Sequence, residues 1–175
     1  MNSHHVMTQH LAPRTSRRRR SAPGFSLVEL LVVVVIVSVL ATIGLPLAEL
    51  AQKRTQEEEL RIALRGIRKA LDDYRLAVDE GRIPRAVGAS GYPPDLRTLE
   101  AGVPDAKSPR GEKMFFMRRL PRDPFAPASI QDAAATWGLR SYASTAEAPQ
   151  PGADVYDVYS RADGTGFNGV PYRKW

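Results

Sequence analysis

The sequence predicts an α+β fold, in which one long N-terminal helix packs on a small antiparallel sheet within a loop-rich C-terminal region. The first observation behind this prediction is an uncharged run of 19 residues, Leu30 to Ala48. The second is the helical spacing of apolar residues that follows it, up to Val78. The third is a pair of short strand patterns among later prolines and glycines. At 175 residues the chain has room for one modest domain with an appendage.

Much of the positive charge lies in front of the apolar run. The formal net charge is +6, and residues 1–24 hold five arginines, including Arg17 to Arg20, and no acid. Such a basic segment indicates a nucleic-acid-binding arm, the n-region of a secretory or twin-arginine signal, or a positive-inside anchor. No aromatic residue is interleaved with the arginines, which disfavours nucleic acid as a partner. We expect residues 1–24 to be an unstructured cytoplasmic leader.

Residues 25–48 are expected to form a transmembrane helix. At about 1.5 Å per residue this segment spans the ~30 Å hydrocarbon core of a bilayer. Its many valines would favour a strand in water, but in hydrocarbon each backbone polar group must be satisfied within the segment, which selects a helix. The length of the run disfavours the alternative, a buried core helix of a soluble protein.

One acidic residue, Glu29, interrupts this apolar segment. It lies one turn inside, where an unpaired carboxylate costs about 2.5–3.5 kcal/mol. Cleavage between Gly24 and Phe25 would create an α-amino group four residues away and supply the missing cation. A cut after the apolar run is disfavoured, because Leu45 to Glu49 offers no convincing small-x-small site. The alternative for Glu29 is snorkelling of its side chain toward the headgroups.

The segment Gly24-Phe25-Ser26-Leu27-Val28-Glu29 resembles the cleavage and N-methylation motif of type IV pilin-like proteins, the pilins and pseudopilins. Pro46, the 22nd residue after the expected cut, matches the family's helix-interrupting proline. The resemblance implies that a prepilin peptidase cuts after Gly24 and methylates the amine of Phe25. It also implies that, in a filament, Glu29 receives the Phe25 ammonium of a neighbouring subunit. Because Pro46 lacks a backbone N–H, we expect it to break or kink the helix.

Residues 49–80 are predicted to be an amphipathic continuation of the same helix, which would run from about Ser26 to Glu80. Charged residues, Glu57 and Arg68 among them, are expected on the other faces. The apolar stripe would cover a head domain; the alternative is a coiled-coil seam, for which fewer than three heptads are available. Apolar residues recur at steps of four and three: Leu60, Leu64, Ile67, Leu71, Tyr74 and Val78.

Residues 81–175 are predicted to form a loop-rich head. All but three of the 14 prolines and all but three of the 13 glycines follow Glu80. The expected elements are a short helix at 95–101, a strand or turn at 115–120, strands at 137–143 and 155–161 joined by a loop at 144–153, a hairpin turn at Asp163-Gly164 and an edge strand at 167–172.

Three segments of the head indicate which group within the pilin-like family the chain resembles. In order, Tyr92-Pro93, Leu120 to Phe125 and Tyr156 to Gly164 look like the major pseudopilin, the G-type subunit of type II secretion. In that family the loop after the Ala-Asp-Gly element binds calcium, so Asp163 and Ser160 are candidate metal ligands. Calcium takes six to eight oxygen ligands, and no acid follows Asp163. A plain turn without a cofactor is therefore favoured.

Together these features predict a structural subunit, not an enzyme. It would polymerise through its N-terminal helix into a periplasmic pseudopilus that drives type II protein secretion. The implied partners are further copies of the chain, other pseudopilins, the prepilin peptidase, the inner-membrane secretion platform and membrane lipid. The expected location is the inner membrane, crossed once, with the leader cytoplasmic and the head periplasmic.

Three alternatives remain. The chain would be a type IV pilus or competence pilin, a minor pseudopilin, or a signal-anchored periplasmic enzyme. The lack of cysteine argues against pilins, whose C-terminal region is often closed by a disulfide, and it excludes thiolate catalysis. An enzyme is further disfavoured because all three histidines lie in residues 1–24, and no nucleophilic triad or phosphate-binding loop is found.

Overall fold

The computed structural model describes residues 24–175, except for the side chains of residues 43–46. Helix α1 runs over Leu27–Asp79, which confirms the predicted long N-terminal helix. The chain divides into two compact units, Met1–Gly44 and Leu45–Trp175; the second, called the head here, includes the C-terminal part of α1. The predicted leader lies outside the described residues except for Gly24.

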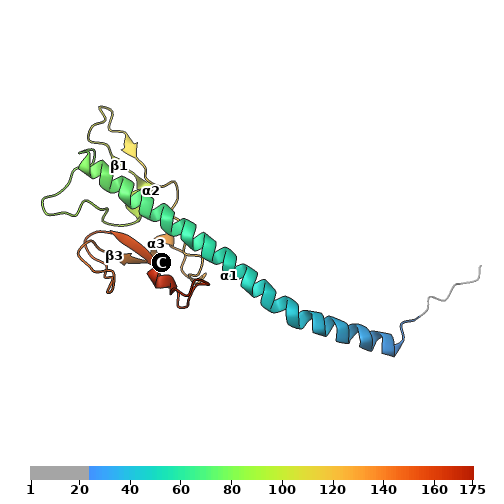
Figure 1. Cartoon of the computed structure of the whole chain (residues 1–175). Coiled ribbons are helices and arrows are strands. Elements are labelled where there is room, and N and C mark those ends of the chain that lie inside the picture. Colours follow the sequence, from blue (N-terminus) through green and yellow to red (C-terminus); the bar gives the residue numbers. More distant parts are fainter. Residues whose placement is uncertain (1–23) are drawn as a thin grey trace, which may run out of the picture. The chain divides into compact units, whose positions relative to one another are not determined.

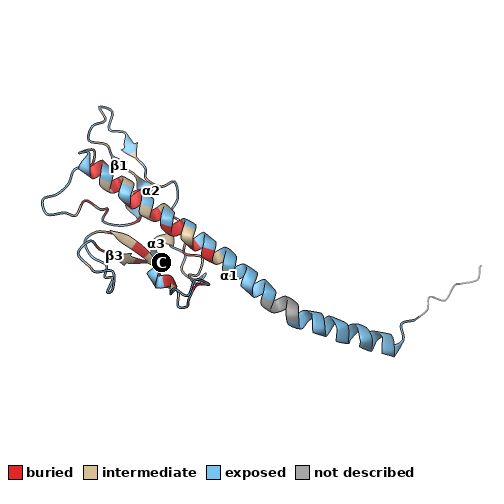
Figure 2. Cartoon of the chain, in the orientation of Figure 1, coloured by how far each residue is buried: buried red, intermediate tan, exposed pale blue. Residues whose placement is uncertain are grey.

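The part of α1 in the head buries one face. Figure 2 shows the buried positions along this part of the helix, whereas the described N-terminal part is exposed. All six residues of the predicted stripe are buried, because the rest of the head, residues 81–175, packs against them; no second helix is needed to cover the stripe. The buried apolar residues of α1 are Leu60, Ala63, Leu64, Ile67, Ala70, Leu71, Tyr74, Ala77 and Val78.

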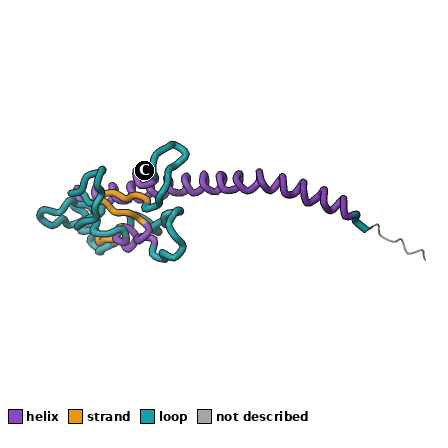
Figure 3. Tube along the Cα trace, turned by 90° about the horizontal axis from the view of Figure 1, so that it is seen from below, coloured by secondary structure: helices purple, strands orange, loops and turns teal. Residues whose placement is uncertain are grey.

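Short elements and long loops make up the rest of the head (Figures 1 and 3). Helix α2 forms where it was predicted, and the Asp95 carboxylate accepts a hydrogen bond from the Thr98 N–H at 2.8 Å near its start. The elements are α2 (Arg97–Ala101), β1 (Val103–Pro104), β2 (Lys113–Met114), α3 (Ala133–Thr136), β3 (Trp137–Arg140), β4 (Asp157–Ser160) and the 3₁₀ helix η1 (Tyr172–Lys174).

The strands form two small antiparallel sheets, β1–β2 and β3–β4. In the second sheet Trp137 pairs with Ser160 and Arg140 with Asp157. This confirms strands within the predicted segments 137–143 and 155–161, although each strand has only four residues. A side chain at Gly138 would come within 2.3 Å of the Tyr159 ring, so the close approach at this step needs glycine. Residues 144–153 form the connecting loop, as predicted.

Two predictions for the C-terminal segment are wrong. Residues 167–172 do not form an edge strand, because the N–H of Phe167 donates to Glu57 and the carbonyl of Val170 accepts from Gly166 and from the Trp175 indole. These groups are therefore unavailable to a sheet. The chain reverses at residues 167–169, inside a single bridge between Thr165 and Pro171, and not at Asp163-Gly164.

The segment 115–120 is a bend and not a strand. Directly after β2, the N–H groups of Phe116 and Met117 both donate to the carbonyl of Leu99, at 3.1 and 3.0 Å. These bonds turn the chain toward the end of α2 and take the N–H groups that would have extended the ladder. Phe116 then packs against Tyr74 of α1, with the ring centroids 5.2 Å apart.

Candidate processing and assembly site

The predicted cleavage point lies just before α1, in non-helical chain. Phe25 is 81% exposed, and a Cβ built at Gly24 would meet no described atom within 4 Å. Packing in the described chain therefore gives no reason for glycine at this position. A cutting enzyme that needs close approach to the backbone would give one.

Ser26 fixes the start of the helix. Its hydroxyl oxygen accepts a hydrogen bond from the Glu29 N–H at 3.1 Å, and its carbonyl accepts from the Leu30 N–H at 3.1 Å. Ser26 is thus the N-cap, a residue that the predictions above do not include, and the Ser-x-x-Glu spacing of a capping box is the signal for it in the sequence. The cap separates the non-helical residues Gly24 and Phe25 from the helix that follows.

Glu29 lies in the first turn of α1 and is exposed. The partial positive charge of a helix N-terminus favours an acid at this position. Its carboxylate makes no hydrogen bond or ion pair with the described residues 24–175. The side chain is therefore free to receive a cation brought by another molecule.

The described residues around this acid are mostly apolar and exposed. The described large apolar side chains from Phe25 to Leu50 are 47–81% exposed. In the part of the chain that the structure describes, α1 is the one helix long and apolar enough to cross a membrane. The helical assignment continues through Pro46, whose side chain lies outside the description. The predicted helix break at Pro46 therefore stays a prediction.

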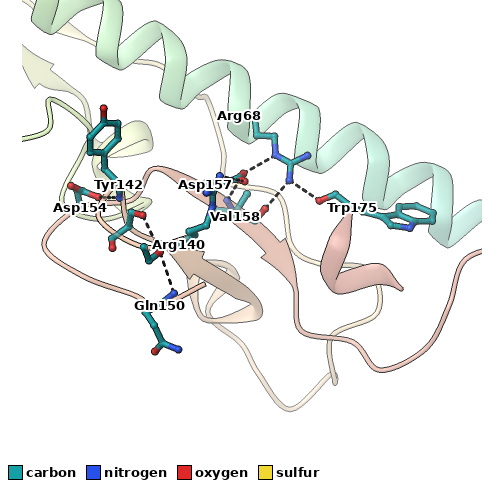
Figure 4. A network of polar contacts seen from close by, with 10 residues as sticks. Arg68, Arg140, Tyr142, Gln150, Asp154, Asp157, Val158 and Trp175 are labelled. Atoms are coloured by element: carbon teal, nitrogen blue, oxygen red, sulfur yellow. Dashed lines mark hydrogen bonds and ion pairs between the residues drawn. The ribbon is translucent and has the colours of Figure 1, made fainter. Parts of the chain in front are cut away.

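Arg68 of α1 ties the helix to the end of the chain (Figure 4). Its guanidinium donates to Asp157 Oδ1 at 2.8 Å, to the Val158 carbonyl at 3.1 Å and to the Trp175 main-chain oxygen at 2.7 Å. Arg140 donates to the other oxygen of Asp157 at 3.1 Å. The sequence placed Arg68 on a solvent-facing side, but it is half-buried and joins α1, β4 and η1.

Glu57 was also predicted to face solvent, and this prediction is wrong. It is 2% exposed; its Oε1 accepts from the Tyr172 hydroxyl at 2.9 Å and from the Phe167 N–H at 3.1 Å. Position 57 extends the apolar stripe, because Leu60 follows by three residues. The periodicity places Glu57 on the buried face, and the hydroxyl and amide donors make a charge tolerable there.

The Glu57–Tyr172 pair predicts a loss of stability at alkaline pH. Burial, with the hydrogen bond to Glu57, raises the pKa of Tyr172 to about 12. The folded state favours the neutral phenol, so this stabilisation is complete below about pH 10 and is lost as the pH rises through about 12. In Tyr172→Phe the loss of folding stability at alkaline pH should be smaller than in the wild type. At pH 8 the free energy of unfolding of the variant should be lower than that of the wild type by about 1–3 kcal/mol.

Urea unfolding of the full chain in detergent at pH 8 and pH 11 checks this expectation. Tyr142→Phe, at a tyrosine that is 61% exposed, is the matched control. Burial also raises the pKa of Tyr74 and Tyr92, so some alkaline sensitivity should persist in Tyr172→Phe. An alkaline loss identical in wild type and Tyr172→Phe would contradict the role given to this hydroxyl.

A buried aspartate holds the segment Leu120 to Phe125. Asp123 is 1% exposed; its carboxylate accepts from the Ser160 hydroxyl at 2.6 Å and from the Phe125 N–H at 2.9 Å. Its own N–H donates to the Thr136 hydroxyl at 3.1 Å. The segment thereby connects α3 with β4. Leu120 to Phe125, one of the three segments that look like the major pseudopilin, thus has a structural role.

The two calcium candidates have different surroundings. Ser160 is fully buried, and its hydroxyl donates to Asp123, whereas Asp163 is exposed on the loop after β4. In the described part of the chain no group of three or more His, Cys, Asp or Glu side chains is arranged to hold a metal ion. Calcium binding stays a disfavoured prediction.

Comparisons with known proteins agree with the N-terminal geometry. The family model for the prokaryotic N-terminal methylation motif matches residues 19–45. The type II secretion system core protein G of Klebsiella michiganensis is 29% identical over 112 residues, which cover 62% of this chain and 71% of that protein. No solved structure matches the chain.

The motif, the capped apolar helix and the small antiparallel head together resemble those of type IV pilin-like proteins, and the long N-terminal helix with its small sheets is consistent with that α+β fold. Within that class it resembles a major pseudopilin. The apolar helix and the motif fit a protein that crosses the inner membrane once.

Proposed function

We propose that the chain is a pseudopilin, a structural subunit that polymerises through α1 into a periplasmic filament and thereby drives type II protein secretion. The observation that carries the proposal is Glu29, a lone exposed acid in the first turn of an apolar helix, directly behind a Gly-Phe cleavage point. The motif match and the resemblance to core protein G support it.

Cleavage after Gly24 would change this end of the chain in two ways. It would remove five arginines, which otherwise hold that end at the cytoplasmic surface. It would also create an ammonium at Phe25, which the prepilin peptidase would methylate. In a filament the Phe25 ammonium of one subunit would pair with Glu29 of a neighbour, so that two charges that are costly alone neutralise each other in an apolar setting.

The rest of the chain would support assembly and not catalysis. With the leader cytoplasmic, the head would lie on the periplasmic side, where it would meet other pseudopilins. The secretion platform in the inner membrane would feed subunits into the filament. The described head offers a packed structural core around α1 and the buried Asp123 and Glu57, and its described acids form no metal-binding cluster.

Protease accessibility separates this proposal from its main alternative, a surface-exposed pilin. At native expression, protease added to intact cells should leave the head uncut, and the same protease added to spheroplasts should digest it. Deletion of the gene should leave exported proteins in the periplasm. Digestion of the head on intact cells, together with normal secretion after deletion, would favour the type IV pilin and overturn the proposal.

A further inference from the structure

We propose that the head carries its own contact site for the surface of an anionic bilayer. This site, called the lipid-facing site here, consists of Lys53 and Arg54 on α1 and of Phe167 on the loop beside them. The inference rests on the proposed membrane-inserted subunit and goes beyond it, because it assigns lipid contact to the folded head and not only to the transmembrane helix.

Phe167 lies within cation–π distance of two cations. The Nζ of Lys53 lies 4.8 Å from the ring centroid and the Cζ of Arg54 lies 5.6 Å from it. Lys53 also donates to the Thr165 carbonyl at 2.9 Å, and Glu57 accepts from the Phe167 N–H. These bonds fix the loop against one turn of α1, yet 49% of Phe167 remains exposed. A half-exposed aromatic ring next to two cations suits the boundary between water and lipid.

The position along α1 corresponds to the headgroup layer. Leu50, 47% exposed, is the last exposed large apolar residue before the first cations of the head. Lys53 and Arg54 follow it by three and four residues, or about 4.5–6 Å along the helix axis. The headgroup region adds about 5–7 Å on each side of the hydrocarbon core. When Leu50 lies at the edge of the hydrocarbon, the lipid-facing site lies at headgroup depth.

The charge of the site complements anionic lipid. Arg54 is exposed and makes no ion pair with the described residues. Lys53 lies 4.0 Å from Glu57, but that carboxylate is buried and already accepts from Tyr172. Glu49 is the one acid in residues 45–56. Within residues 50–56 the two charged side chains are therefore both cations, whereas the exposed acids Glu58 and Glu59 lie about 12–13.5 Å beyond Leu50 along the helix axis, outside the headgroup layer. Each such cation near an anionic surface is attracted to it.

Site-directed spin labelling tests the inference on the mature full chain. The chain has no cysteine, so Val170→Cys, Val87→Cys and Val39→Cys each give one labelling site. Val170 lies on the loop of the lipid-facing site, Val87 on the distant and fully exposed loop after α1, and Val39 in the apolar part of α1. Collisions with a water-soluble nickel chelate are measured in nanodiscs of phosphatidylglycerol or of phosphatidylcholine.

The label at residue 170 should be shielded from nickel in phosphatidylglycerol and accessible in phosphatidylcholine. Lys53→Gln and Arg54→Gln should each lower the ratio of lipid-shielded to water-accessible label at residue 170 by about fivefold, and both together by about 25-fold. Arg110→Gln, which removes an exposed cation from the β1–β2 loop, is the matched control and should change nothing. Salt at about 1 M should release the lipid-facing site from the bilayer surface, since it shortens the Debye length to ~3 Å.

The three labels separate the possible failures. A label at 170 as accessible as the label at 87 in phosphatidylglycerol, with the label at 39 shielded, would overturn the inference and leave the proposed function intact. An accessible label at 39 would refute the membrane arrangement on which both rest. Spin–spin broadening at 170 that disappears on dilution with unlabelled chain would show that a second copy covers the loop, and this also would overturn the inference.

Discussion

The Glu29→Leu variant is expected to enter the membrane and lose residues 1–24 like the wild type, yet to be absent from filaments. Insertion should not suffer, because the substitution removes a carboxylate whose cost in lipid is about 2.5–3.5 kcal/mol. The helix start should also survive, since Ser26 accepts from the backbone N–H of residue 29 and not from its side chain. The substitution therefore isolates the carboxylate.

The expected assembly defect is large. Without Glu29, the Phe25 ammonium would be buried among apolar helices with no partner, and removing one member of a buried ion pair costs about 3–5 kcal/mol. That corresponds to about a 100-fold to 5,000-fold loss of incorporation. Quantitative blotting of sheared or pelleted filaments against total mature subunit measures it.

Two further variants define what the Glu29→Leu result means. Ser38→Leu makes an exposed position of the same helix apolar, and its hydroxyl bonds only to Val34 within the helix, so it should assemble normally. Glu29→Gln keeps the size of the side chain and loses the charge, and it should fail as Glu29→Leu does. Normal incorporation of Glu29→Leu or of Glu29→Gln would refute the ionic pairing.

Asp123→Ala is expected to destabilise the head by about 2–4 kcal/mol, because it leaves one buried and one partly buried donor without their acceptor. The hydroxyl of the fully buried Ser160 and the partly buried Phe125 N–H both donate to this carboxylate. Urea unfolding followed by tryptophan fluorescence measures the change. Trp137 is a suitable reporter, since it is fully buried and its indole donates to the Pro121 carbonyl at 2.9 Å.

Asp132→Ala provides the comparison for Asp123→Ala. Asp132 also accepts a backbone N–H, from Ala134 at 3.2 Å, and it pairs with Arg97 at 2.6 Å, but it is exposed. Its loss should cost about 1 kcal/mol, as is usual for an N-cap and a surface ion pair. Equal effects of the two substitutions would show that the burial of Asp123 does not matter.

The sequence was sufficient for the features that repeat at a fixed period. Helix α1 was predicted from about Ser26 to Glu80 and extends over Leu27–Asp79. The steps of three and four residues identified the buried stripe from Leu60 to Val78 correctly. Strands β3 and β4 also lie within segments that local patterns had identified, because alternation or β-branched and aromatic residues persisted over four or more positions.

Features that depend on distant partners were missed. The helical periodicity puts Glu57 on the buried face, but the donors that make a charge tolerable there, Phe167 and Tyr172, lie more than 100 residues later, and no local pattern reveals them. The same contact explains why 167–172 is not a strand. Strands β1 and β2 have two residues each, too few for any alternation to be visible.

The N-terminal site contains, within a few residues, features that the sequence predicted and one that was missed. The motif around Gly24 and Glu29 was recognisable, and so was the mismatch between a lone acid and an apolar segment. The N-cap at Ser26 was readable from its spacing to Glu29 but was not used. The lipid-facing site was not accessible to sequence reasoning, because Phe167 reaches Lys53 and Arg54 only through the fold of the head.

The intact mass of the chain purified from native membranes tests the central claim most directly. The claim is that proteolysis turns Phe25 into the cation that makes Glu29 tolerable and useful in a polymer. The measured mass should correspond to residues 25–175 plus one methyl group. A polypeptide that still carries residues 1–24 would have no α-amino group at Phe25, and that result would contradict both the pairing with Glu29 and the filament-forming role.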